Sequence, residues 1–198
     1  MKKTEPILAL ISLLAVLMRI FHIPGADALL VICITGLTFI YFYVGFALFN
    51  GIHVTKIFKK DSYREVERKR ILGGVVTGMV LSISLMGIMF KLLVFPGAQL
   101  MLIQGITGIA IVMIIALIRF YTGKDQYYKR ILKRIVVVGF FNVILLSIPN
   151  KTWLNWNYPN NPDYVNAVLN AEKDSKNVEL REKVEEEWKK MKESKKTR

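Results

Sequence analysis

The sequence has few of the residues from which disulfide frameworks, metal sites and catalytic centres are built. Its 198 residues include a single cysteine, Cys33, which excludes an intramolecular disulfide. The two histidines, His22 and His53, fall on opposite sides of a membrane in the topology predicted below, which argues against a shared metal site. No glycine-rich phosphate loop precedes Lys-Ser or Lys-Thr, and no arrangement of a serine with a histidine as a catalytic pair is compatible with that topology. The sequence therefore predicts no catalytic residue, no cofactor and no metal ligand, and hence a protein that is not an enzyme.

Acidic residues are absent from the apolar segments of the chain. The chain has 15 Asp and Glu against 28 Lys and Arg, a net charge of +13, and no carboxylate falls within the apolar segments described next. Intramembrane proton relays normally use a buried acidic group, so we expect no such relay. The basic residues lie in the gaps between apolar segments, a pattern that membrane topology explains better than binding to nucleic acid.

Apolar residues are abundant, at 53% of the chain, and they occur in long runs. Crossing a hydrocarbon core of roughly 30 Å takes about 20 largely apolar helical residues, because backbone polar groups find no water there. Five segments approach that length: Pro6 to Ile23, Leu29 to Phe49, Ile71 to Phe95, Met101 to Phe120 and Ile131 to Ile148. The sequence therefore predicts an all-α integral membrane protein, with about five transmembrane helices in residues 1–150 and an exposed, charged helical tail in residues 151–198.

The loops between these segments predict the orientation, because cytoplasmic loops are enriched in Lys and Arg. The loops after the second and fourth segments carry Lys56, Lys59, Lys60, Arg64, Arg68, Lys69, Arg70, Lys124, Lys129, Arg130, Lys133 and Arg134. We therefore expect a cytoplasmic N-terminus and, after five crossings, a tail on the outer side. If the fifth segment does not span, the tail is cytoplasmic.

The first segment has a second interpretation. A basic start at Lys2 and Lys3, an apolar stretch and the sequence Ala26-Asp27-Ala28 are typical of a secretory signal with a cleavage site. The same segment recurs inside the chain, where a signal peptide is impossible, and this favours a retained transmembrane helix.

The chain repeats itself at an offset of 72 residues. Residues 11–36 placed over residues 83–108 share Ile-Ser-Leu, Pro-Gly-Ala and Ile-Thr-Gly in one register, and Arg19 falls on Lys91. The alternative is two hairpins that look alike because membrane segments draw on few residue types.

Each copy, about residues 7–50 and 72–122, contains two crossings, so both copies enter the membrane from the same side and form a parallel repeat. The sequence therefore predicts two tandem two-helix hairpins followed by a fifth helix at about residues 131–148.

Each hairpin has the same turn and the same basic position before it. Proline stops a helix and glycine permits a tight reversal. The turn motif comprises Pro24, Gly25, Ala26, Pro96, Gly97 and Ala98. Arg19 and Lys91 lie about five residues before the prolines, where a long basic side chain can extend its charge to the headgroups as an anchor. The alternative is contact with an anionic lipid or with a partner protein.

Gly74 and Gly78 have the spacing that lets two helix backbones approach closely. This pattern predicts helix packing, either within one chain or in a homo-oligomer.

The tail is predicted to contain two helices. Asn161-Pro162 is typical of a helix start, and a second helix is predicted from near Asn177 to Glu193. An apolar stripe on the second helix comprises Leu180, Val184, Trp188 and Met191. Such a stripe can dock a partner, return to the membrane surface or close onto the first tail helix.

The two turn elements, residues 18–26 (Met-Arg-Ile-Phe-His-Ile-Pro-Gly-Ala) and 90–98 (Phe-Lys-Leu-Leu-Val-Phe-Pro-Gly-Ala), resemble the membrane hairpin of the GldL family, an inner-membrane component of bacterial gliding motility and type IX secretion. The resemblance covers roughly residues 7–49 and 79–120. It implies a bacterial inner membrane and supports the hairpin topology, so the outer side on which the charges of the loops place the tail is the periplasm. The family's motor uses a glutamate in the second helix of the hairpin, but residues 34–37 and 106–109 contain none, so the resemblance does not imply proton-driven motion.

Two functions follow as hypotheses. The first is a non-enzymatic scaffold or accessory subunit of a membrane complex, in contact with lipid and with a protein partner or a second copy. The second is a small transporter or channel with a site at the repeat interface, for which Thr35, Gln104 and Thr107 are the polar candidates.

Overall fold

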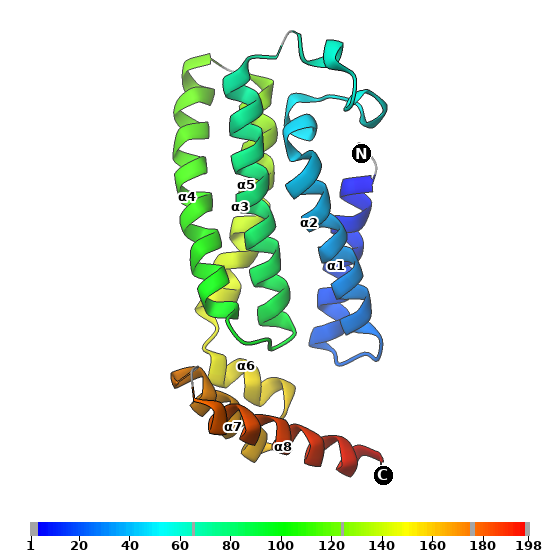
Figure 1. Ribbon diagram of the computed structural model, residues 1–198, viewed down its shortest axis with the longest axis vertical. Coiled ribbons are helices and arrows are strands. Elements are labelled where there is room, and N and C mark those ends of the chain that lie inside the picture. The colour runs from blue at the N-terminus through cyan, green and yellow to red at the C-terminus, as the bar shows by residue number, and fades with distance from the viewer. Residues whose placement is uncertain (1–3, 65, 124, 175–176, 197–198) are drawn as a thin grey trace. The chain divides into compact units, whose positions relative to one another are not determined.

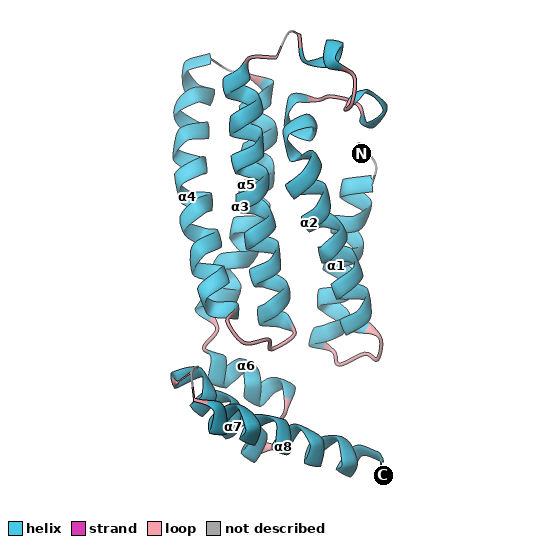
Figure 2. Cartoon of the chain, viewed as in Figure 1, coloured by secondary structure: helices cyan, strands magenta, loops and turns pink. Residues whose placement is uncertain are grey.

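The structure is a computed structural model in which residues 4–64, 66–123, 125–174 and 177–196 are described (Figure 1). Within those residues every regular element is a helix, so the prediction of an all-α protein is confirmed (Figure 2). The chain divides into two compact units, Met1–Leu146 and Ser147–Arg198. Each unit is described separately below.

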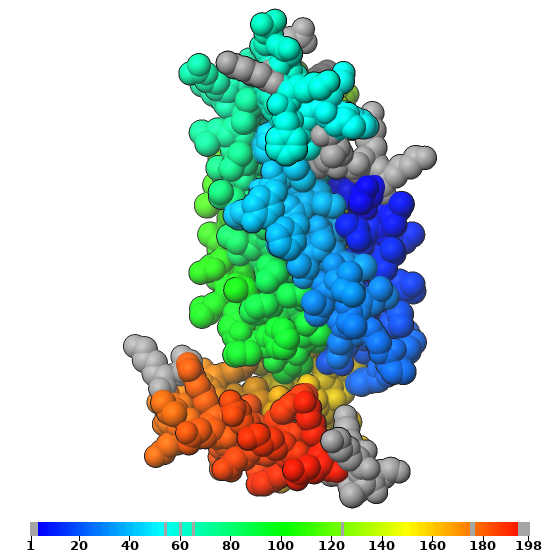
Figure 3. Space-filling model, turned by 45° about the vertical axis from the view of Figure 1, so that its right-hand side comes forward, coloured from blue at the N-terminus to red at the C-terminus, as the bar shows by residue number. Residues whose placement is uncertain are grey.

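The first unit is a bundle of five helices. Its helices are α1 (Thr4–Ile20), α2 (Ala26–Asn50), α3 (Arg68–Leu92), α4 (Ala98–Gly123) and α5 (Gln126–Ser147), with two short 3₁₀ turns, η1 (Val54–Lys56) and η2 (Lys60–Tyr63). Close packing occurs between helices that follow each other in the chain: α1 with α2, α2 with α3 and α3 with α4. Figure 3 shows α1 and α2, in blue, side by side on one face of the bundle.

Apolar side chains fill the bundle and also cover it. Fully buried side chains include Leu30, Leu81, Leu102 and Ile135 from α2, α3, α4 and α5. Strongly exposed ones include Leu10, Ile32, Leu72, Leu100 and Phe140, one from each of the five helices. An exterior that is apolar on every helix would be an aggregation surface in water and is the expected surface in lipid.

Among the described residues, three helices are long and apolar enough to cross a membrane: α2, α3 and α4, with mean hydropathies of 2.2, 2.1 and 2.5. A fourth crossing is obtained only if α5 and α6 (Asn150–Asn157) are counted together as a broken span. Helix α1 has 17 residues. Several apolar helices thus indicate a membrane protein, while length and composition support three or four crossings and not all of the five predicted.

The two hairpin turns have the same backbone conformation. His22 and Val94 have positive φ values of 55° and 62°, and Gly25 and Gly97 have 87° and 80°. In each turn, the non-glycine residue donates its N–H to a carbonyl three residues earlier, and the next residue donates to a carbonyl five residues earlier. This is the Schellman arrangement, which closes the C-terminus of a helix. It explains why α1 and α3 each end three residues before the predicted ends at Ile23 and Phe95.

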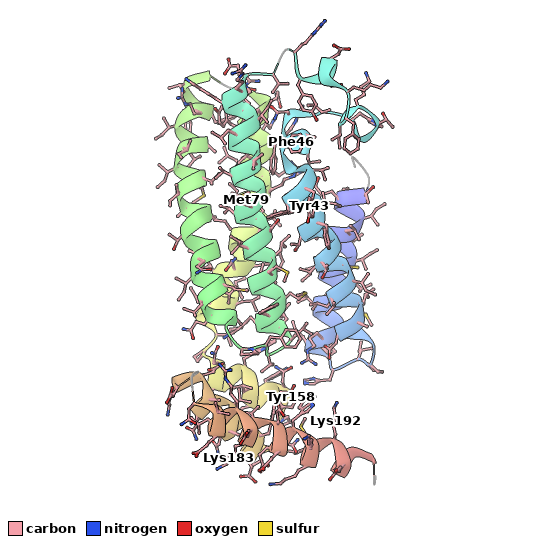
Figure 4. All side chains as sticks on the ribbon, in the orientation of Figure 1. Tyr43, Phe46, Met79, Tyr158, Lys183 and Lys192 are labelled. Atoms are coloured by element: carbon pink, nitrogen blue, oxygen red, sulfur yellow. The ribbon has the colours of Figure 1, made fainter. Side chains whose placement is uncertain are left out.

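Glycines on α2 and α3 bring these two helices into backbone contact. A Cβ atom on Gly78 would lie 2.2 Å from the Tyr41 carbonyl oxygen, and one on Gly74 would lie 2.8 Å from the Phe46 Cα. Figure 4 shows Phe46 on α2 beside α3. Both predicted packing glycines therefore lie at a contact within the chain, where a side chain would force the helices apart.

The second unit contains α6, α7 (Pro162–Lys173) and α8 (Val178–Lys196). Asn161 precedes α7 at the predicted cap position but makes no side-chain cap. Asn177 does cap α8, because its Oδ1 accepts hydrogen bonds from the N–H groups of Glu179 and Leu180 at 3.0 and 3.4 Å. Helix α6 was not predicted, since its eight residues are too polar and too short to show a clear periodicity.

The aromatic residues of the tail hold the second unit together. The Trp188 ring of α8 packs on the rings of Tyr158 and Tyr164, with centroids 6.3 and 5.5 Å apart. Tyr158 also meets Tyr164 edge-to-face at 4.9 Å; Figure 4 labels Tyr158. The sequence left three roles open for the apolar stripe of α8. Trp188 has one of them, because it packs α8 against the preceding tail residues. Leu180 and Val184 are half-buried, and Met191 is 4% exposed.

Candidate functional site

A buried ion pair joins the first helix of the bundle to the last. Arg134 donates from Nε to Glu5 Oε1 at 2.5 Å and from Nη2 to Glu5 Oε2 at 2.6 Å, a two-pronged contact. Tyr41 donates its hydroxyl to Glu5 Oε1 at 2.8 Å, so α1, α2 and α5 meet at one carboxylate. The side chains of Arg134 and Glu5 are 19% and 11% exposed. Bidentate pairing with a further donor is the geometry that a buried carboxylate needs.

This pair corrects two sequence-based expectations. The first apolar segment was predicted to start at Pro6, which left Glu5 outside it, but α1 starts at Thr4 and buries Glu5. Arg134 was counted among the cytoplasmic loop cations although it falls inside the predicted fifth segment, and it belongs to α5. This helix starts at Gln126, where the Asp125 carboxylate accepts the Tyr127 N–H at 3.0 Å. The signal for α5 was present as basic residues spaced by three and four positions, which is a helical spacing.

A second polar cluster ties α3 to α5 at the same end of the bundle. Arg70 pairs with Asp125, and the Tyr127 hydroxyl donates to the Arg70 carbonyl at 2.8 Å. Arg130 donates to the Phe49 carbonyl at 3.2 Å, near the end of α2. The loop cations on which the predicted orientation depends thus lie at one end of the bundle and partly bind within it. Lys124, another of these predicted loop cations, lies outside the described residues.

A cavity of about 580 Å³ lies between α1 and α5, with α2 and α3 forming its floor. Glu5, Gln126, Lys129, Arg130, Lys133 and Arg134 line its polar part. Ala9, Leu13, Ile34, Leu85, Val137 and Phe141 line its apolar part. The volume falls in the usual range for small-molecule sites, and apolar walls with a few grouped charges are typical of such sites.

The predicted polar candidates at the repeat interface do not line this cavity. The Thr35 hydroxyl lies 3.9 Å from the Met89 sulfur. Gln104 and Thr107 are exposed on α4, where the Thr107 hydroxyl donates to the Ile103 carbonyl at 2.9 Å. These three residues therefore do not form one site.

The two predicted basic positions differ from each other in the structure. Arg19 forms an ion pair with Asp27 across the first turn, at 3.2 Å, and donates to the Leu92 carbonyl at 3.4 Å. Its side chain is 14% exposed. Lys91 is 4% exposed, so its charge is not at the surface as a snorkelling anchor requires. Gln99 stands at the position of the second hairpin that is equivalent to Asp27.

Asn142 is a buried polar residue that sequence reasoning did not single out. It is 0% exposed in the middle of α5, and neither atom of its amide has a hydrogen-bond partner among the described residues. A Cβ on Gly105 would lie 3.1 Å from the Asn142 amide nitrogen, so the missing side chain at Gly105 makes room for it. The sequence did carry a signal for this residue, because Asn142 is a polar residue within an apolar run.

Among the described residues, no group of three or more His, Cys, Asp and Glu side chains is arranged to hold a metal ion. Compared with known proteins, the chain matches no family model, and no curated protein or solved structure matches it significantly. The function of this chain is therefore inferred from its own geometry.

Proposed function

We propose that this protein is a non-enzymatic subunit of a membrane complex, a scaffold or accessory component of a bacterial inner membrane. All five bundle helices cross the bilayer in this proposal. The 17 residues of α1 span about 26 Å, and the Glu5 charge at its start is compensated by Arg134. The N-terminus is cytoplasmic and the tail periplasmic, because the basic residues gather at the opposite end of the bundle from the Pro-Gly-Ala turns.

The two hairpins descend from a duplication in this proposal. The shared residues at the 72-residue offset and the matching backbone angles of the two turns support it. The similarity of these turns to the GldL hairpin supports an inner-membrane setting related to gliding motility or type IX secretion. The ion pair in this chain, however, holds Glu5 at the start of α1, away from the position that the GldL motor uses.

The observation that supports the scaffold role is that the tail forms a compact unit of its own. Residues 147–198 form a compact unit held by its own aromatic cluster, so a charged module is joined to an apolar bundle. The exposed side chains of α8 carry mixed charges: Arg181, Glu182, Lys183, Glu185, Glu186 and Lys189. A charged helical surface favours recognition of a partner with complementary charge.

Purification from the native membrane in mild detergent tests this role. We expect a companion protein in stoichiometric amount, and we expect Lys183→Glu with Lys189→Glu to weaken its recovery. The matched control reverses Lys56 and Lys59 in the loop of the bundle, and it should retain the companion. Recovery of the chain alone, in monomeric form, would contradict the proposal.

A small transporter is the second candidate, and the cavity between α1 and α5 favours it. Transport requires access to the cavity from both sides of the membrane. With Cys33 replaced by Ala, a single cysteine at Val137 can be labelled by a membrane-impermeant thiol reagent in vesicles of either orientation. Labelling in both orientations is expected of a transporter, whereas labelling in one orientation only excludes alternating access at this site.

A further inference from the structure

The cavity between α1 and α5 changes character along its length. On α5, the wall begins with Gln126, Lys129 and Lys133 and continues with Val137 and Phe141. These residues follow one another at intervals of three and four, so they form one stripe that is polar at one end and apolar at the other. The stripe spans 16 residues and therefore about 22 Å from the first to the last. A ligand that matches it has a polar head and an apolar tail.

The polar end of the cavity favours an anion. Four cations line it, at positions 129, 130, 133 and 134, against the single carboxylate of Glu5 among the described lining residues, so the local charge is 4 − 1 = +3. Glu5 is bound on both oxygens by Arg134 and also by Tyr41. Its charge is therefore already compensated, and the side chains of Lys129 and Lys133 can bind a further anion. Arg130 donates from Nη1 to the Phe49 carbonyl and has its other guanidinium nitrogens for the same anion.

The lining of the cavity indicates its occupant. Basic residues lie at one end and apolar walls at the other, which matches a molecule that joins an anionic group to hydrocarbon. The cavity holds about 580 Å³. A narrow, flexible hydrocarbon chain fits such a volume.

The cavity is accessible from the surroundings of the bundle. Helices α1 and α5 are not among the closely packed pairs, and the ion pair bridges the gap between them. Two apolar lining residues, Leu13 and Val137, are 41% and 53% exposed. An occupant can therefore enter sideways from the lipid phase.

We propose that this cavity is a binding site for an anionic phospholipid, with one acyl chain between α1 and α5 and the phosphate at Lys129, Arg130 and Lys133. The inference goes beyond the scaffold role, because a resident lipid fills the gap beside α5 whatever partner the protein has. Anionic headgroups are attracted to basic residues near the membrane surface, and the ordered stripe on α5 adds a fixed depth for the chain.

Native mass spectrometry of the purified, delipidated protein tests the site, with phosphatidylglycerol and phosphatidylcholine added separately in detergent. We expect the protein to retain one phosphatidylglycerol and little phosphatidylcholine. Replacing Lys129 and Lys133 with Gln should reduce the preference for phosphatidylglycerol about 30-fold, given the attraction of each basic residue for an anionic headgroup. Replacing Lys56 and Lys59 with Gln is the matched control and should leave the preference unchanged.

A second pair of variants tests the acyl chain. Ala9→Trp fills the apolar part of the cavity and should abolish retention of phosphatidylglycerol, whereas Leu10→Trp on the outer face of α1 should retain it; gel filtration of both variants verifies folding. The proposal is overturned if the protein shows no preference between the two lipids, or if the Lys56 and Lys59 control loses as much as the Lys129 and Lys133 variant. Inorganic phosphate that competes equally in Ala9→Trp and in the unmodified protein would identify a site for free anions and also overturn it.

Discussion

The Glu5–Arg134 pair makes a quantitative prediction about stability. Glu5→Gln keeps the shape of the side chain and removes its charge, which leaves the Arg134 guanidinium buried without its carboxylate. Removing one partner of a buried pair costs about 3–5 kcal/mol. Arg134 keeps a hydrogen bond to the Arg130 carbonyl at 2.9 Å and stacks over the Phe49 ring at 5.6 Å. We therefore expect a loss near the lower end, about 3 kcal/mol.

The double variant Glu5→Leu with Arg134→Met separates charge from packing. Apolar replacement of both partners leaves no uncompensated charge and is often nearly neutral, so we expect the double variant to be more stable than Glu5→Gln alone. Tyr41→Phe removes only the hydroxyl donor to Glu5 and should cost about 1 kcal/mol.

Reversible unfolding in mixed micelles, followed by helical circular dichroism, measures these three variants and the parent. The single variants Glu5→Leu and Arg134→Met complete the double-mutant cycle. A coupling of at least 2 kcal/mol between positions 5 and 134 is expected, roughly the cost of a stranded buried charge. Equal stability of Glu5→Gln and the parent, or a double variant less stable than the single one, would refute the reasoning that the pair is buried and mutually dependent.

Three further predictions concern helix packing, the second turn and the tail. Gly78→Ala should destabilise the bundle by about 1–3 kcal/mol, because the added Cβ forces α2 and α3 apart. Gly123→Ala is the control in the same unfolding assay and should be neutral, because its added Cβ lies in open space. Val94→Gly should stabilise the protein by about 1 kcal/mol, because φ of 62° is strained for a β-branched residue; no gain in unfolding free energy would contradict this. Burial raises the pKa of Tyr164 to about 12, so the stability it contributes is complete below pH 10 and is lost as the pH rises towards 12. Tyr164→Phe should remove this alkaline loss from the circular dichroism of the full chain, and an unchanged alkaline transition would exclude this residue as its cause.

Topology is tested by reporter fusion at the C-terminus. With five crossings from a cytoplasmic N-terminus, alkaline phosphatase should be active there and green fluorescent protein should be dark. The opposite result would mean that α1 or α5 does not cross the membrane.

The predicted helices were most accurate where one physical requirement dominates. The apolar runs of α2, α3 and α4 predicted helices because backbone groups must bond internally in lipid, and that requirement depends on composition alone. All five helices start two to five residues before their predicted starts, and charged residues enter the helix at α1, α2, α3 and α5. The sequence shows that a charge lies beside apolar residues, where an unpaired charge destabilises the fold. It does not show which partner compensates the charge, because Glu5 and Arg134 are 129 residues apart.

The sequence by itself determined the helical class, the turns at Pro-Gly-Ala and the change of character near residue 150, because each depends on local propensity or on hydropathy. Only the tertiary structure decided that Gly74 and Gly78 face α2, that Arg19 pairs with Asp27, and that α1 and α5 enclose a cavity with a basic mouth. These features depend on which helix faces are brought together, and a periodic pattern specifies a face without specifying its neighbour.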